Sequence, residues 1–213
     1  PNSRLNSMML DIANKLGVIS SSTLDYDNVI IETEKYDSTW TYEKTKGYQP
    51  GVAFIGEIPV YIEGRNGNSP ARYKMFDTLK RCLSLLEAKQ IPIKRFRSDS
   101  AAYQYSIVKL MGKREIEFFI RAISSFDLTL ECEEITHWEK HSFGSSYFEL
   151  GEIGYVPFKD KNVKEYRAIV KRVKTDTGYS HYVILTNNKD LKPLEVLNFY
   201  NQRGKIERNF DDL

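Results

Sequence analysis

The chain has 213 residues, 41% of them hydrophobic and 28% charged, which is typical of a globular protein with one hydrophobic core. A formal net charge of +2 is too small to indicate a nucleic-acid partner by itself, and no apolar run is long enough to span a bilayer. Cys82 and Cys132 lack the paired spacing of a disulfide framework or a zinc site, so we expect a reducing, cytoplasmic environment.

Predicted helices and strands alternate through the first part of the chain. Apolar residues at helical spacing predict helices, and short runs rich in β-branched and aromatic residues predict strands. In chain order these are a helix over 5–16, strands over 24–32, 51–56 and 58–62, a helix over 73–89, a strand over 93–97, a helix over 101–111 and a strand over 115–123. This order predicts an α/β fold in which helices flank a mixed central sheet.

The character of the sequence changes after residue 123. Short strands separated by turn signals are predicted over 128–132, 147–150, 155–158, 166–173 and 181–186, before one last helix from Lys192 onward. We therefore divide the chain into the first part of an α/β core (1–123), a β-rich insertion subdomain (124–188) and a C-terminal core helix (189–213). Because the sequence begins with Pro1 and ends inside this helix, we expect a fragment of a longer protein.

Two carboxylates stand at positions where a carboxylate is unusual. Asp27 lies in an otherwise apolar predicted strand, and a buried carboxylate is costly unless it is paired or binds a metal. Asp99 directly follows the predicted strand over 93–97, and the ends of parallel strands are where sites form. Asp25 points to the same strand face as Asp27, so it remains an alternative for the first acid.

The last predicted helix carries a third acid. Tyr200, Arg203 and Glu207 are spaced i, i+3 and i+7, which places them on one helix face beside an apolar face. An ordinary ion pair between Arg203 and Glu207 would also explain this spacing. Three carboxylates that converge would suit Mg²⁺ or Mn²⁺, and two such ions can promote phosphoryl transfer.

These segments resemble a known family. The stretch 200–207 is similar to the Tyr-x2-Arg-x3-Glu-x6-Lys signature of bacterial insertion-sequence transposases of the insertion-sequence-four group and its relatives. Residues 24–27 resemble the first-aspartate strand of those enzymes, and 97–101 resembles their Arg-x-Asp-Ser motif. The resemblance implies a ribonuclease H-like fold with a β-rich insertion. There the first acid lies on the first strand, the second follows the fourth strand, and the third lies on a late helix.

The resemblance also implies an activity. Asp27, Asp99 and Glu207 would hold two Mg²⁺ or Mn²⁺ ions, hydrolyse a phosphodiester bond at the element ends and then catalyse strand transfer. The partner would be double-stranded DNA, bound by a homodimer of the full-length protein in the bacterial cytoplasm. Tyr200 and Arg203 would contact DNA phosphate, and Trp138 would stack on a flipped base. Further candidates for phosphate contacts are Lys94, Arg97, Arg167, Lys171 and Arg172.

The sequence departs from the family pattern at three places. The signature lysine would fall beyond Leu213, Val29 stands where the family has Thr or Ser, and the tract 33–49 is longer than in relatives. Two alternatives therefore remain: a nuclease without strand transfer, and a DNA-binding remnant that no longer cuts. His137 and His141 have a spacing that could bind zinc on a helix, but the sequence offers no third ligand.

Overall fold

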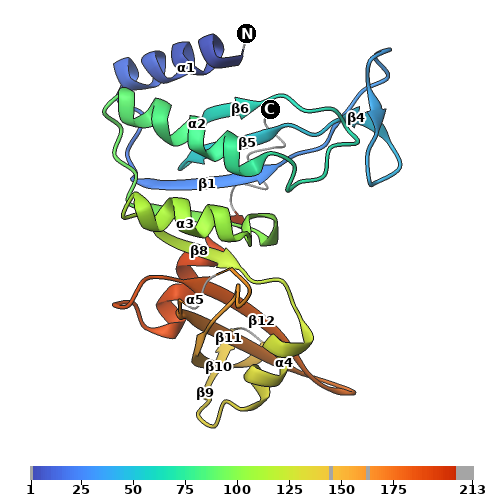
Figure 1. Cartoon of the computed structure of the whole chain (residues 1–213), viewed down its shortest axis with the longest axis vertical. Helices are drawn as coiled ribbons and strands as arrows, with labels where there is room; N and C mark the ends of the chain where they lie inside the picture. The colour runs from blue at the N-terminus through green and yellow to red at the C-terminus, as the bar shows by residue number, and fades with distance from the viewer. Residues whose placement is uncertain (1, 144–145, 162–163, 205–213) are drawn as a thin grey trace.

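A large mixed sheet organises the chain in the computed structural model, which describes residues 2–143, 146–161 and 164–204. Within these ranges, nine strands form one sheet in the order β6-β5-β1-β7-β8-β12-β11-β10-β9 (Figure 1). The strands are β1 (Thr23–Asn28), β5 (Gly51–Ile55), β6 (Ile58–Glu63), β7 (Arg95–Ser98), β8 (Glu117–Arg121), β9 (Glu139–Phe143), β10 (Ser146–Tyr155), β11 (Tyr166–Thr175) and β12 (Gly178–Thr186). The helices are α1 (Asn2–Leu16), α2 (Met75–Ala88), α3 (Tyr105–Lys113), α4 (Phe126–Glu133) and α5 (Pro193–Asn201).

The sheet is parallel at its centre and antiparallel toward both edges. Strands β1, β7 and β8 run in the same direction, and β5 pairs antiparallel with β1 and with β6. On the other side, β12 pairs antiparallel with β8 and begins the antiparallel run β12-β11-β10-β9. The predicted mixed sheet with flanking helices is therefore confirmed. None of the described helices is long and apolar enough to cross a lipid bilayer.

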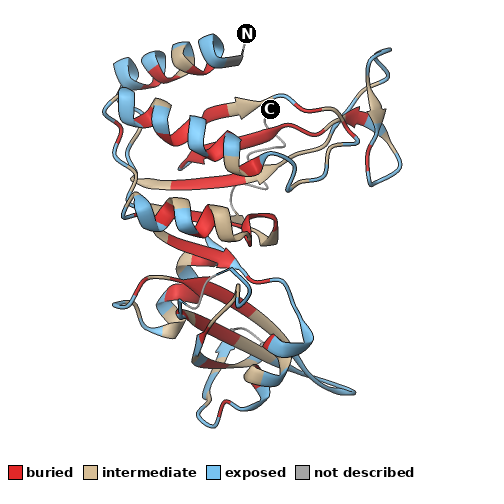
Figure 2. Ribbon diagram, in the orientation of Figure 1, coloured by how far each residue is buried: buried red, intermediate tan, exposed pale blue. Residues whose placement is uncertain are grey.

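Helices cover both faces of the sheet, but unequally. One face carries the main core, where α2 packs Leu79, Leu83 and Leu86 against buried strand residues such as Tyr26 and Phe96. These leucines recur at helical spacing, so they form one apolar stripe on the helix. Buried residues of α1, α3 and α4 join the same core, and Figure 2 shows the buried strands between these helices and the opposite face. The opposite face is covered by α5, whose residues Val196 and Leu197 pack on β8, β11 and β12.

Helix α1 also closes one edge of the sheet. The side-chain amide of Asn6 accepts a hydrogen bond from the backbone N–H of Ile62 (2.9 Å) and donates one to the carbonyl oxygen of Ile62 (3.0 Å). Ile62 lies in the edge strand β6, where backbone groups would otherwise lack a strand partner. Asn6 is fully buried at this contact.

The second part of the chain differs from the prediction in three elements. The predicted strand over 128–132 is instead helix α4, because Ser125 caps its first turn by accepting a hydrogen bond from Leu128 N (3.2 Å). The strand predicted over 147–150 is part of the longer strand β10, whereas residues 156–158 of the strand predicted over 155–158 lie outside any strand. Strand β9 was not predicted. Since β12 pairs with β8, the β-rich segment continues the central sheet.

A small second sheet projects from the end of β1. Its strands are β2 (Ile31–Glu32), β3 (Thr39–Trp40) and β4 (Lys46–Tyr48), in the order β2-β4-β3. We call residues 31–48 the finger. It leaves the large sheet after β1 and returns at β5, and Figure 1 shows β4 beyond the arrowhead of β1.

Candidate active site

Two of the predicted acids lie side by side at one edge of the parallel strands. In the register of β1 with β7, Tyr26 pairs with Ser98, and the next residue on each side is Asp27 and Asp99. Asp99 has extended backbone angles and caps the short 3₁₀ helix Ser100–Ala102, accepting a hydrogen bond from Ala101 N (3.0 Å). This turn separates β7 from α3, so the predicted helix over 101–111 begins only at Tyr105. Both carboxylates are therefore held at the carboxyl ends of adjacent parallel strands.

The carboxylate of Asp27 is partly buried and electrostatically coupled to its neighbours. Burial raises the pKa of Asp27 to about 6, the charge of Arg203 lowers it, and the charge of Asp99 raises it. Arg203 Nη1 donates to Asp27 Oδ2 at 2.6 Å, and Asp27 Oδ1 accepts from Asn28 N at 2.9 Å. The repulsion between Asp27 and Asp99 means that a cation between them would be stabilised.

The alternative first acid, Asp25, has a different environment. Its carboxylate is 1% exposed and receives two hydrogen bonds from Arg97, at 2.6 Å from Nε and 2.7 Å from Nη2. The third nitrogen of Arg97, Nη1, donates to the carbonyl oxygen of Phe199 at 2.6 Å. Burial raises the pKa of Asp25, and Arg97 opposes that rise. Asp25 and Arg97 thus form a buried pair that also fastens α5 to the sheet.

The end of α5 lies over the two acids. The hydroxyl of Tyr200 donates to the carbonyl oxygen of Ser98 at 3.3 Å, and the side chain is 2% exposed. Helix α5 ends at Asn201, and Arg203 N bonds to Tyr200 O in a tighter turn, so the predicted continuous helix through residue 207 is interrupted. Glu207 lies outside the described residues. Arg97 and Tyr200 were both expected on DNA phosphate, but the structure places them inside the fold.

The sequence of the chain also matches a known family. The profile of the family described as transposase DDE domain group 1 matches residues 3–211. The chain belongs to this family. The transposase assignment is confirmed at this level, whereas membership of the insertion-sequence-four group remains a prediction. No curated protein is similar enough in sequence to count as a match.

Two solved structures are distantly similar to this transposase domain. One is the piggyBac transposase synaptic complex with hairpin DNA, with a TM-score of 0.49 and 7% identity, covering 88% of this chain. The chain spans only 39% of the length of that transposase. The other is the NurA nuclease from Sulfolobus solfataricus, with a TM-score of 0.36 and 10% identity, covering 91% of this chain and 81% of the nuclease.

The remaining expected DNA contacts of this transposase domain lie away from the acids or are already paired. Lys94 is exposed but precedes β7, at the opposite end of the strand from Asp99. Arg167 bonds to Glu152 and to the carbonyl oxygen of Leu191.

The predicted stacking residue Trp138 is also packed locally. Its Nε1 donates to Ile135 O at 2.8 Å, and the guanidinium of Arg172 lies 3.8 Å from its ring centroid. Arg172 bonds in turn to Glu149 at 2.5 Å, so both expected DNA contacts already have partners within the fold. The ring of His141 stacks on Phe148, and no group of three or more potential metal ligands occurs in the described part of the chain.

Sequence reasoning missed Arg121, which belongs to a row of side chains that continues from the acids across the sheet to the expected contact Lys171. Arg121 follows Ile120, the register partner of Ser98, so it lies next in line after Asp99 on the α5 face. Its guanidinium is 4.4 Å from the ring centroid of Tyr182, and Tyr182 lies 6.1 Å from Tyr200. Lys171, the register partner of Tyr182, lies over the ring of Phe148 at 4.8 Å. The signal was present in the strand alternation, since Phe119 and Arg121 share a face.

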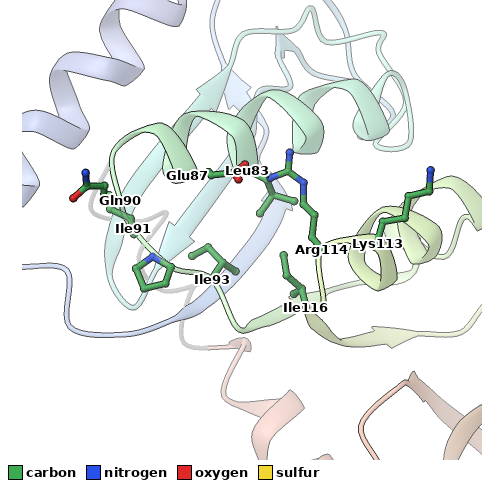
Figure 3. A pocket seen from close by; sticks show the side chains of 9 residues that line it. Leu83, Glu87, Gln90, Ile91, Ile93, Lys113, Arg114 and Ile116 are labelled. Atoms are coloured by element: carbon green, nitrogen blue, oxygen red, sulfur yellow. Dashed lines mark hydrogen bonds and ion pairs between the residues drawn. The ribbon is translucent and has the colours of Figure 1, made fainter.

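A pocket lies at the other end of the strands. It has a volume of about 650 Å³ and is lined by the ends of α2 and α3 and by residues that precede β7 and β8 (Figure 3). Arg114 bonds there to Glu87 and Ser84, and Ile91, Ile93 and Ile116 supply apolar lining. Because Asp27 and Asp99 lie at the carboxyl ends of β1 and β7, this pocket is not part of the acidic site.

Proposed function

We propose that this chain is the catalytic domain of a DNA transposase in which Asp27, Asp99 and Glu207 bind two Mg²⁺ or Mn²⁺ ions. The observation that carries this proposal is the juxtaposition of Asp27 and Asp99 at the ends of adjacent parallel strands, under the end of α5. Glu207 would follow in the segment after α5. The reaction would be hydrolysis of a phosphodiester bond at an element end, followed by attack of the freed 3′-hydroxyl on target DNA.

The strand order supports a ribonuclease H-like core. In that fold the first acid lies on the first strand and the second follows the fourth strand. Here Asp27 lies on β1, and Asp99 follows β7, which is the fourth strand of the large sheet along the chain. The segment 124–188 is then the β-rich insertion, joined to the core through the pairing of β12 with β8.

The donor atoms fit a hard divalent cation. Asp27 and Asp99 offer carboxylate oxygens, the ligands that Mg²⁺ and Mn²⁺ prefer. When bound, such ions would lower the pKa of the attacking water and stabilise charge on the scissile phosphate. Arg203 neutralises Asp27 across 2.6 Å, and we propose that its guanidinium transfers to a DNA phosphate when a cation takes its place.

Buried groups would hold the site in position. We assign Arg97 a supporting role, because its guanidinium joins Asp25 on β1 to the last turn of α5. Tyr200 would act similarly, through its hydrogen bond to Ser98 beside Asp99. Neither side chain needs to touch DNA for this purpose.

The DNA would extend from the acids over β8, β12 and β11. Arg121 and Lys171 lie on the same face as α5, and among the described residues no carboxylate forms an ion pair with either one. By contrast, Arg97, Arg167 and Arg172 are each paired with an acidic residue. Unpaired cations beside a catalytic site suit the phosphates of a double-stranded DNA partner.

One assay tests the function and separates its alternatives. The full-length protein is incubated with Mn²⁺ and DNA that carries the element end, and nicked and strand-transfer products are measured. Asp27→Asn and Asp99→Asn should each reduce nicking by about 10² to 10⁴, since loss of a metal ligand removes several kcal/mol of transition-state stabilisation. Asp176→Asn, in the exposed turn between β11 and β12, is the matched control.

Each alternative predicts a different result. Nicking without strand-transfer products would favour a nuclease, and DNA binding without nicking would favour a remnant that no longer cuts. Nicking by Asp99→Asn at the wild-type rate would refute the proposed acids.

A further inference from the structure

The finger, residues 31–48, grows out of the strand that carries Asp27. Val29 N bonds to Pro50 O at 3.1 Å, which closes the base of the finger just after β1 and just before β5. The finger therefore begins at the carboxyl end of β1, the same end at which Asp27 and Asp99 lie. It also overlaps the tract 33–49, which is longer here than in the family pattern.

The finger exposes large aromatic side chains. Trp40 is 62% exposed, Tyr42 is 72% exposed and Tyr36 is fully exposed. Aromatic residues elsewhere in the same half of the chain, such as Tyr26 and Phe54, are about fully buried. A cluster of exposed aromatic rings on one short segment is typical of a binding surface, because burial of such rings on folding would otherwise be favourable.

Hydrogen bonds hold the finger in a fixed shape. The hydroxyl of Thr39 bonds to Asn66 Oδ1 and accepts from Asn68 N, both at 2.9 Å, and Asn66 Nδ2 donates to Asp37 O at 3.1 Å. Gly67 packs so closely that a Cβ atom would lie 2.5 Å from the carbonyl oxygen of Thr39. The aromatic rings are thus displayed on a rigid support, which reduces the entropy lost on binding.

The finger lies within the electrostatic influence of the acidic site at Tyr42. The pKa of the Tyr42 hydroxyl is raised by burial and by Glu43, and the carboxylates of Asp27 and Asp99 raise it further. Lys46 lies beside the ring of Trp40, with Nζ 5.9 Å from the ring centroid. Because the finger extends from the carboxyl end of β1, its exposed rings and Lys46 lie at the same end of the strands as Asp27 and Asp99 (Figure 1).

We propose that Trp40 and Tyr42 stack on unpaired bases of the DNA strand next to the bond that is cut. The proposal rests on the proposed function, because it takes the ligand of the acidic site to be DNA. Every base has a π-face, so aromatic rings bind unpaired bases without regard to sequence, and a nearby lysine suits the backbone phosphate. Paired bases keep their faces stacked inside the duplex, so the finger requires a locally open strand.

Tryptophan fluorescence tests the contact directly. The chain has two tryptophans, Trp40 and Trp138, so Trp40→Phe and Trp138→Phe report on each separately. The full-length protein, with any tryptophan outside these 213 residues replaced by phenylalanine, is titrated with a duplex that has a short single-stranded extension and with a blunt duplex of equal phosphate number. We expect quenching by the extended duplex in wild type and in Trp138→Phe, and its loss in Trp40→Phe. Equal quenching by both duplexes, or quenching that survives in Trp40→Phe, would overturn the proposal.

Affinity gives a second measurement. Trp40→Ala and Tyr42→Ala should each weaken binding of the extended duplex by about fivefold to a hundredfold and leave binding of the blunt duplex unchanged. Tyr147→Ala is the matched control, because Tyr147 is 78% exposed on β10, far from the finger in sequence and in the sheet. Tyr42→Phe keeps the ring and should bind as wild type does.

Three outcomes separate this proposal from its rivals. If Trp40→Ala dissociates a dimer in analytical ultracentrifugation and binds both duplexes as the wild type does, the aromatic rings pack against a second copy of the chain, and the proposal is wrong. If finger variants bind like wild type while Asp99→Asn abolishes cutting, the proposed function stands without the finger contact. If Asp99→Asn still cuts, the proposed function itself fails, whatever the finger does.

Discussion

Removal of the Arg97 guanidinium should destabilise the fold more than any other single change at the site. The change is Arg97→Met, which leaves the carboxylate of Asp25 buried at 1% exposure with neither of its two hydrogen bonds from Arg97. Breaking a buried ion pair by removing one partner costs about 3–5 kcal/mol. Protonation of Asp25 limits this cost, since keeping a carboxyl of ordinary pKa neutral at pH 7 requires about 4 kcal/mol.

Loss of the bond from Arg97 to Phe199 O adds about 1 kcal/mol. We therefore expect the free energy of unfolding in urea to fall by about 4–5 kcal/mol in Arg97→Met. The double variant Asp25→Leu, Arg97→Met should lose much less, because the unpaired charge is then absent. A loss below about 1 kcal/mol in the single variant would refute the argument, and so would a double variant whose loss equals the sum of the single variants.

Three further changes test other parts of the structure. Mn²⁺ at about a hundred times its dissociation constant should stabilise the wild type by about 2.7 kcal/mol in thermal unfolding, and Asp27→Asn should abolish this gain. Gly51→Ala should lower the free energy of unfolding in urea by about 1–3 kcal/mol, because the added Cβ would lie 1.8 Å from the Tyr26 hydroxyl. In Gly112→Ala the added Cβ meets open space, so this change should raise the free energy of unfolding by about 0.5–1 kcal/mol. Ser125→Ala should cost about 1 kcal/mol and speed hydrogen exchange in α4 selectively, and no change in exchange would show that the cap is unimportant.

Local patterns predicted most of the core elements. Leu79, Leu83 and Leu86 recur at helical spacing, and α2 buries all three. Asp27 and Asp99 were singled out because each stands at an apolar strand, and the parallel pairing of β1 with β7 brings them together. The strand predicted over 128–132 was wrong, because the spacing of Leu128 and Cys132 fits a strand and a helix equally. The N-cap at Ser125 favours the helix that the structure shows.

Long-range pairing was beyond local patterns. The basic residues Arg97, Arg167 and Arg172 looked alike in the sequence, and only their partners Asp25, Glu152 and Glu149 distinguish them from unpaired cations. Those partners lie on neighbouring strands that the register brings together, and register depends on the whole sheet. For the same reason Arg121 was overlooked, although it lies closer to Asp99 in the sheet than any basic residue that was chosen, apart from Arg97.

The contact of Asn6 with β6 has a consequence for how copies of this protein behave when crowded together. An open sheet edge invites another extended chain to add a strand, which is one route to aggregation. At Ile62 the amide of Asn6 occupies both the donor and the acceptor that an incoming strand would use. The opposite edge, β9, has no such cover among the described residues, but it carries the charged pair Glu139 and Lys140. Solubility of this domain therefore depends on its N-terminal helix at one edge and on charge at the other.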